Sequence, residues 1–145
     1  MRDDEYALVE DVEPPASVQP PGAHVVDYEI QKLLSLGWQR YVAVIRSTAG
    51  EVPAPVVRQI TTRFERECHA GDALRCGVRA VSRTRRSYVL EEALWLANSG
   101  EVIATSRVVM TGIDRTTGRA AEIPSTMWKV VEELEGRAIE MSESA

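Results

Sequence analysis

Residues 22–29 are Gly22-Ala23-His24-Val25-Val26-Asp27-Tyr28-Glu29, and the most regular pattern in the chain begins inside this stretch. After Asp27, apolar or small residues recur at steps of three and four, which is the spacing of one helix face. These residues are Ile30, Leu33, Leu34, Gly37, Tyr41, Val44 and Ile45. The pattern predicts a long helix from about Asp27 to about Arg46, with Asp27 as its N-cap.

Gly37 lies in the middle of this apolar face, where glycine costs about 1 kcal/mol of helix propensity relative to alanine. A sheet or partner backbone that approaches too closely for a side chain would explain that cost. The start of the helix carries unpaired N–H groups and a partial positive charge, with His24, Asp27 and Glu29 around it. Such an end can polarise a carbonyl group or hold an anion, so we expect the function to lie there.

Shorter patterns flank this helix. Residues 6–12 predict a weak first strand, and a proline-rich loop then leads to the helix. After the helix, four strands are predicted at residues 56–67, 74–83, 87–97 and 101–113. Pro124 opens a short amphipathic helix, and the residues from about Arg137 are expected to be frayed. Because strands and helices are segregated along the chain, the order predicts an α+β fold with a five-stranded antiparallel sheet.

The composition is that of a globular protein. The chain has 145 residues, 44% of them apolar, and predicts one domain with an ordered core over about residues 6–136. A formal net charge of -5 argues against nucleic acid as the main partner. Cys68 and Cys76 fit no metal-ligand spacing and predict reduced thiols in a cytoplasmic protein. The acidic N-terminus predicts no signal peptide, and no apolar run approaches the roughly 20 residues that span a bilayer.

Three motifs, in order, resemble one enzyme family. Residues 23–27, Ala-His-Val-Val-Asp, stand where the family has a Gly-His-Val-Asn-Asn-like segment at its helix start. Residues 64–74 end in Gly-Asp-Ala-Leu, similar to the family's Gly-Asp-x-Leu. Residues 109–119 end in Asp-Arg-Thr-Thr-Gly-Arg and are followed by Ile123-Pro124, which is similar to the family's last turn and closing Ile-Pro. On these motifs the chain resembles the hotdog-fold acyl-CoA and acyl-carrier-protein thioesterases, in the branch that includes 4-hydroxybenzoyl-CoA thioesterase.

The resemblance implies a hotdog fold, in which a five-stranded antiparallel sheet wraps one long central helix. It implies a homodimer or tetramer, with sheets joined edge to edge and sites at the interface. It also implies hydrolysis of an acyl thioester, with coenzyme A or phosphopantetheine present only as part of the substrate and with no metal. In this family one carboxylate acts as nucleophile or activates water, while amides at the helix N-terminus polarise the thioester carbonyl.

Three residues at the helix start are catalytic candidates, and each has a simpler alternative. His24 can position substrate or water, or only form a hydrogen bond at the helix start. Asp27 can be the general base, or only an N-cap. Glu29 is a second carboxylate, although acidic residues are common in first turns. The carboxylates that family members carry before the Gly-His segment or within the helix are not found at Gln19 or Ser35. Two alternatives therefore stay open: a hotdog acyl-binding or assembly module of lipid or polyketide metabolism, and a hotdog dehydratase.

The predicted substrate-binding residues are Gly22, Ala23, Val25, Val26, Thr61, Thr62, Arg83 and Arg85. The first four flank the helix start, and the two threonines lie in the middle of a strand, where they can line an acyl pocket. The arginines lie at a turn, where they either hold the phosphates of coenzyme A or an acidic carrier protein, or form a solvated hairpin tip. Glu92 shares a predicted core face with Leu90 and Leu94, so it either lines a pocket or is turned outward by a bulge.

Overall fold

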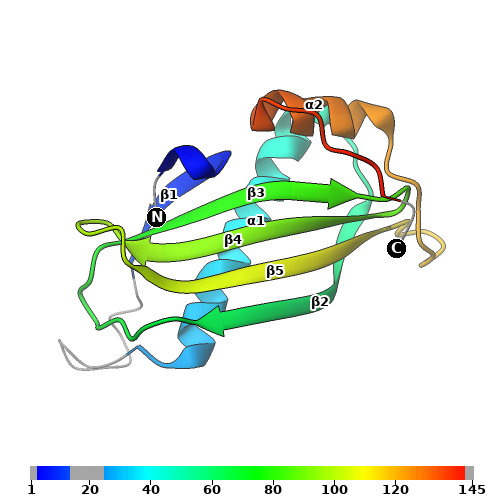
Figure 1. Ribbon diagram of the computed structural model, residues 1–145. Helices are drawn as coiled ribbons and strands as arrows, with labels where there is room; N and C mark the ends of the chain where they lie inside the picture. The colour runs from blue at the N-terminus through cyan, green and yellow to red at the C-terminus, as the bar shows by residue number, and fades with distance from the viewer. Residues whose placement is uncertain (1–2, 14–24, 143–145) are drawn as a thin grey trace.

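The computed structural model describes residues 3–13 and 25–142, and it contains a sheet, one long helix and one short helix (Figure 1). A short 3₁₀ helix, η1, spans Asp3–Glu5. The strands are β1 (Leu8–Val12), β2 (Ala54–Phe64), β3 (Leu74–Arg83), β4 (Ser87–Leu96) and β5 (Val102–Ile113). The helices are α1 (Asp27–Ala49) and α2 (Ser125–Glu135).

The five strands form one antiparallel sheet in the order β1-β3-β4-β5-β2, so β1 and β2 are its edges. Helix α1 crosses one face of the sheet and packs over β3 and β4, and α2 packs beside α1 at one end of that face (Figure 1). This arrangement confirms the predicted α+β fold, with a long helix held against a five-stranded antiparallel sheet.

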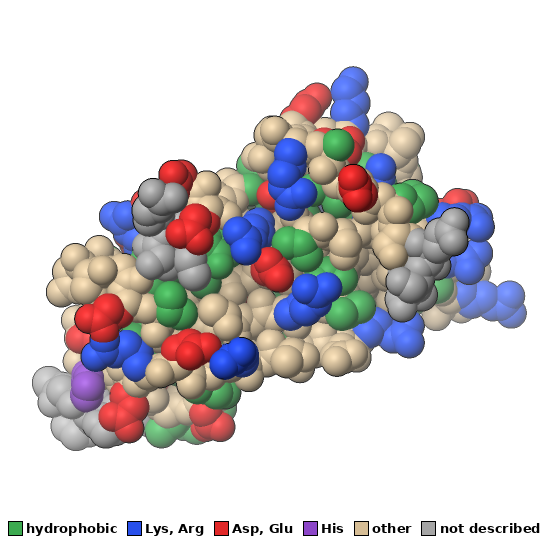
Figure 2. Space-filling view, viewed as in Figure 1, with side chains coloured by type: hydrophobic (Ala, Val, Ile, Leu, Met, Phe, Trp, Pro, Cys, Tyr) green, Lys and Arg blue, Asp and Glu red, His purple; other side chains and the backbone are tan. Residues whose placement is uncertain are grey.

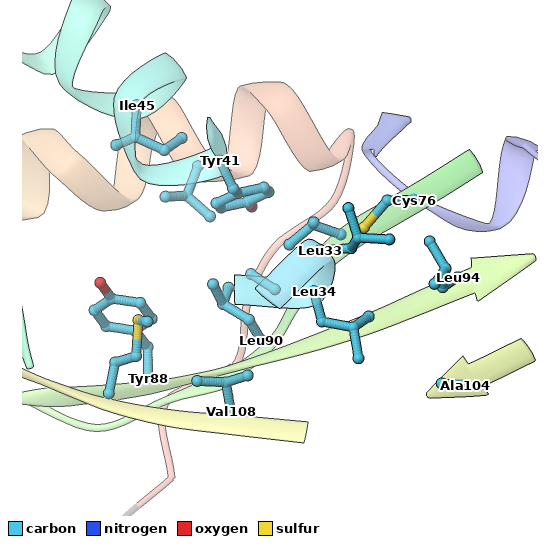
Figure 3. Packing of buried hydrophobic residues seen from close by; sticks show 14 of the residues in the cluster. Leu33, Leu34, Tyr41, Ile45, Cys76, Tyr88, Leu90, Leu94, Ala104 and Val108 are labelled. Atoms are coloured by element: carbon cyan, nitrogen blue, oxygen red, sulfur yellow. The ribbon is translucent and has the colours of Figure 1, made fainter. Parts of the chain in front are cut away.

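The core fills the space between α1 and the sheet. The apolar stripe of α1 is buried at Ile30, Leu33, Leu34, Tyr41 and Ile45, as the spacing predicts. Val44, predicted on the same stripe, is 37% exposed. Figure 3 shows Leu33, Leu34, Tyr41 and Ile45 of the helix near apolar side chains of β3, β4 and β5. The alternation predicted for β3 is also confirmed, because Leu74, Cys76, Val78 and Ala80 are all at most 2% exposed.

Gly37 occupies the closest approach of α1 to the sheet. A Cβ atom at Gly37 would lie 2.7 Å from Glu92 Oε2 and 2.8 Å from Cys76 Sγ. Both distances are shorter than a carbon atom can tolerate, so a larger residue would force these side chains or the helix to shift. The predicted reason for the glycine, a sheet too close for a side chain, is confirmed.

The other face of the sheet carries several charged side chains beside the buried residues Ala93 and Trp95. On this face Arg79 Nη2 lies 3.0 Å from Glu91 Oε1, and Arg107 Nη1 lies 3.4 Å from Glu91 Oε2. Figure 2, which views this face, shows blue and red side chains interspersed across it. One face of the sheet is therefore apolar and covered by α1, and the other combines ion pairs with the buried residues Ala93 and Trp95.

Aromatic pairs mark two opposite parts of the sheet. Near edge strand β1, Tyr6 stacks on Trp95 with ring centroids 5.6 Å apart. Near α2, Tyr88 meets the edge of Trp128 at 5.9 Å, and the guanidinium of Arg83 lies 4.8 Å above the Trp128 ring. Each pair fixes an outer element against the central strands.

Three sequence predictions need correction. Helix α1 ends three residues later than expected, at Ala49, where Gly50 takes a positive φ of 78°. Strand β2 begins at Ala54 and includes Pro55, because an edge strand has a free side on which proline's missing N–H is not needed. The segment after Arg137 is not frayed up to residue 142, since Ile139 is 2% exposed and its backbone N–H donates to Glu132 Oε2.

Both cysteines are free and buried. Within the described residues, no helix combines the length and the apolar character needed to cross a bilayer.

Candidate functional site

The start of α1 is anchored to the loop that follows β2. Val25 donates its backbone N–H to the Cys68 carbonyl at 2.9 Å, and Val26 is the N-cap residue with an extended backbone. The prediction that Asp27 caps the helix is wrong, because Asp27 is the first residue inside α1 and no side chain of the described residues caps this end. The Asp27 carboxylate is exposed and has no capping role, so it is available for chemistry.

A surface groove runs between the first turns of α1 and the last residues of β2. It is lined by Asp27, Tyr28, Gln31, Ile60, Thr62 and Phe64. Tyr28, Ile60 and Phe64 are exposed despite their size, at 62%, 38% and 53%. The groove thus combines one carboxylate, apolar walls and the unpaired N–H groups of a helix N-terminus.

Thr62 connects the two sides of this groove. Its hydroxyl donates a hydrogen bond to Gln31 Oε1 at 2.6 Å, joining β2 to α1. Thr62 Oγ1 also lies 3.3 Å from the hydroxyl of Ser106, which is the cross-strand neighbour of Thr62 on β5. Ser106 is 5% exposed, so this pair of hydroxyl groups extends from the groove into the core.

Glu92 lies on β4, directly opposite Ser106 of β5, so it follows Thr62 and Ser106 across three neighbouring strands. It is 1% exposed, and neither of its oxygens makes a hydrogen bond of normal geometry to the described part of the chain. Burial raises the pKa of Glu92 to about 8, and the nearby Trp38 backbone and Arg40 guanidinium lower it by less. Glu92 is not turned outward by a bulge, because it faces α1 beneath Gly37, and it does not line the groove.

Glu29 lies on the buried side of the first turn of α1, at 9% exposure. Its Oε2 atom is buried and has no hydrogen-bond partner among residues 3–13 and 25–142. Glu29 does not line the groove, so the structure separates the two carboxylates of this turn into an exposed one, Asp27, and a buried one.

The other predicted site residues fall in different places. Gly22, Ala23 and His24 lie outside the described residues. Val25 is half-buried against the core and Val26 is exposed at the helix start. Thr61 is exposed and pairs in register with Arg107, on the face of β2 opposite Thr62, so it does not line the groove.

The two arginines lie at the far end of the sheet. Arg83 pairs in register with Tyr88, whose β5 partner is Met110, and Met110 pairs with Val57 on β2. The groove residue Phe64 follows Val57 by seven residues, which corresponds to roughly 23 Å along a strand.

Both arginines also have partners at that end. Arg83 Nε donates to the Ile139 carbonyl at 2.9 Å, and Arg85 Nε lies 2.9 Å from Glu122 Oε1. Within one chain the structure therefore does not bring these arginines to the groove.

A second hollow lies near that far end, between the end of α1 and the loop after β5. Its lining mixes cations such as Arg46 and Arg115 with acids such as Glu51, Asp114 and Glu122. The C-terminal end of α1 adds a partial negative charge there, which opposes the binding of anions. Within the described residues, no group of three or more metal-binding side chains is present.

Sequence reasoning missed four of the six groove residues: Tyr28, Gln31, Ile60 and Phe64. The signal for Gln31 was its position one helical turn after Asp27, which places both side chains on one face of α1. No sequence signal could pair Gln31 with Thr62, because the contact depends on how the helix lies across the sheet.

A family comparison matches the model of the thioesterase-like superfamily to residues 23–132. A comparison with curated proteins gives no significant match. The structure is similar to a thioesterase from Thermus thermophilus, solved with coenzyme A and zinc, with a TM-score of 0.77. That match has 23% identity and covers 92% of this chain and 98% of that chain.

Two further solved structures have the same fold. A Staphylococcus aureus protein in complex with coenzyme A gives a TM-score of 0.76 at 14% identity, over 92% of this chain and 87% of that chain. A 1,4-dihydroxy-2-naphthoyl-CoA thioesterase from Synechocystis gives 0.72 at 11% identity, over 88% and 96%. These likenesses confirm the predicted hotdog fold. Because the family model spans more than half of the sequence, the chain belongs to the thioesterase-like superfamily.

Proposed function

We propose that the protein hydrolyses an acyl thioester in the groove between α1 and β2. The observation that carries this proposal is the groove lining, in which the exposed Asp27 carboxylate stands at a helix N-terminus beside apolar walls. Membership of the thioesterase-like superfamily supports the same reaction. The acyl group would lie on Tyr28, Ile60 and Phe64, which places its carbonyl near the start of α1.

In the proposed mechanism, Asp27 accepts a proton from a water molecule as that water attacks the thioester carbonyl carbon. The N–H groups of the first turn stabilise the negative charge that develops on the carbonyl oxygen. Collapse of the tetrahedral intermediate breaks the carbon–sulfur bond. The leaving thiolate takes up the proton that Asp27 had accepted, so the thiol and the carboxylic acid are released and the Asp27 carboxylate is regenerated.

The substrate would carry its acyl group on coenzyme A or on an acyl carrier protein. The coenzyme A complexes of the Thermus thermophilus and Staphylococcus aureus proteins support the first carrier. We also propose a homodimer formed through β2, because this edge strand carries exposed Val56, Ile60 and Phe64. An exposed edge strand with apolar side chains favours pairing with another chain.

The test is thioester hydrolysis by the purified protein on short, long and aromatic acyl-CoAs and on acyl carrier proteins. Asp27→Asn should lower kcat by about 100-fold to 10,000-fold, the range typical of a lost general base. Its melting temperature should stay close to that of wild type, because Asp27 is exposed and makes no cap. Asp11→Asn, an exposed aspartate on edge strand β1, is the matched control and should keep full activity.

Three results would redirect the proposal. Loss of activity in Glu29→Gln with full activity in Asp27→Asn would assign the base to the buried carboxylate of the same turn. Loss in His24→Ala alone would move the chemistry to the segment before the helix. No turnover of any thioester by wild type would contradict the proposed function and favour an acyl-binding module.

A further inference from the structure

The amide of Gln31 is held in one orientation. Its Oε1 atom accepts the Thr62 hydroxyl at 2.6 Å, and a carbonyl oxygen can only accept. The single hydroxyl proton of Thr62 therefore forms the hydrogen bond to Gln31. In its contact with Ser106 at 3.3 Å, Thr62 can only accept, so Ser106 is the donor. The direction of both hydrogen bonds follows from the chemistry of the Gln31 carbonyl.

This orientation decides what Gln31 offers to a ligand. With Oε1 held by the Thr62 hydroxyl, the two N–H bonds of Nε2 are what the amide can donate to a molecule in the groove that Gln31 lines. Asp27, one helical turn earlier on the same groove wall, offers only acceptor oxygens when ionised. The groove thus presents an acceptor and a donor one turn apart.

Hydrolysis of a thioester requires both kinds of group. The attacking water must lose a proton to an acceptor, and the carbonyl oxygen must be stabilised by a donor as it becomes negative. We propose that Gln31 Nε2 donates a hydrogen bond to the thioester carbonyl oxygen, with Thr62 and Ser106 as positioning residues that fix the amide. This inference rests on the proposed function and adds the side-chain donor that complements the backbone N–H groups.

The kinetic test uses variants that keep the shape of the groove. Gln31→Glu still accepts from Thr62 but presents a second acceptor to the carbonyl, so kcat should fall by about 100-fold to 1,000-fold, as for a lost oxyanion donor. KM should change by less than about threefold, because the interaction strengthens only in the transition state.

Two variants of Thr62 distinguish a hydroxyl that positions the Gln31 amide from a side chain that only fills space. Thr62→Val keeps the shape but releases the amide, so it should lower kcat with little change in KM, whereas Thr62→Ser should restore kcat. Thr61→Val removes a neighbouring hydroxyl on the opposite face of β2 and is the matched control. Equal kcat in wild type, Thr62→Val and Gln31→Glu would overturn the inference while leaving thioester hydrolysis intact.

A binding measurement decides the contact independently of turnover. The probe is an octanoyl-coenzyme A ketone, in which a methylene group replaces the thioester sulfur and the carbonyl is kept. In nuclear magnetic resonance spectra, the side-chain NH₂ signals of Gln31 should shift on binding, and Thr62→Val should reduce the shift. If wild type hydrolyses no thioester, the proposed function fails, and the probe still decides the carbonyl contact. If the ketone binds and the Gln31 side-chain signals do not shift, the proposed contact between Gln31 and the carbonyl is overturned.

Discussion

At the scale of single residues, Glu92 makes the stability of the fold depend on pH. Its folded pKa is about 8, above the ordinary value of 4.5, so the folded protein holds a proton that the unfolded chain releases between these values. The free energy of unfolding should therefore fall as the pH rises from about 4.5 to about 8, and level off above. The Arg40 guanidinium lowers the pKa of Glu92, and Glu92 in turn raises the pKa of the Cys76 thiol.

The predicted change is that Glu92→Gln flattens this dependence, because the amide cannot ionise. Urea unfolding at several pH values measures the free energy directly, and the variant should gain on wild type as the pH rises. Glu91→Gln, on the opposite face of the same strand, is the control and should keep the wild-type slope. Identical slopes in wild type and Glu92→Gln would show that another group causes the effect.

The cysteines give a second prediction at this scale. Burial raises the pKa of the Cys76 thiol to about 12 and that of Cys68 to about 11, and each side chain is at most 2% exposed. Because the thiolate is the reactive form, neither thiol should react with a coloured disulfide reagent in the native protein. Both should react once the protein is unfolded in guanidinium. Rapid labelling of the native state would mean that the region around β3 opens.

At the scale of elements, the close contact of α1 with the sheet depends on Gly37. Gly37→Ala should destabilise the protein by about 1–3 kcal/mol, since the added carbon would overlap Glu92 and Cys76, although alanine favours helix. Thermal unfolding provides the measurement, and Gln39→Ala, at an exposed position of the same helix, is the control. A more stable Gly37→Ala would show that α1 shifts without cost.

The elements differ in how much of them the sequence predicts. Strand β3 and the buried stripe of α1 follow from periodicity, because apolar side chains recur on the face of each that packs in the core. The end of α1 is not predictable in this way because Ser47 and Thr48 are polar and the small Ala49 adds little to the apolar pattern. The start of β2 is also not predictable from the sequence, because its prolines are typical of a loop. A proline there fits a strand only if that strand lies at the edge of the sheet, which the sequence does not show.

The groove was only partly predictable for a similar reason. Its helical wall lies near one motif, which identifies Asp27 and the first turn. Its other wall depends on β2 reaching the start of α1 after a chain reversal, and no local pattern specifies that Thr62 meets Gln31. Neighbouring residues of a strand point to opposite faces of the sheet, so the pairing register of β2 with β5 decides which threonine faces α1. Thr62, and not Thr61, therefore lines the groove.

At the scale of the whole molecule, β2 is a long edge strand beside the groove. If two copies pair through β2, light scattering should give twice the mass of one chain. The outward amides of β2 should also exchange with solvent as slowly as those of β5, because both sides of β2 would then be hydrogen-bonded. A mass of one chain with rapid exchange along β2 would contradict the dimer and leave the groove complete within one protomer.

The two aromatic pairs allow the intrinsic tryptophan fluorescence to report on two separate parts of the fold. Trp95 next to Tyr6 senses whether β1 is attached, and Trp128 next to Tyr88 senses whether α2 is attached. With Trp38 also replaced by phenylalanine, variants that keep only Trp95 or only Trp128 would emit from one end of the sheet at a time. Time-resolved fluorescence during unfolding would then show which margin of the fold loosens first.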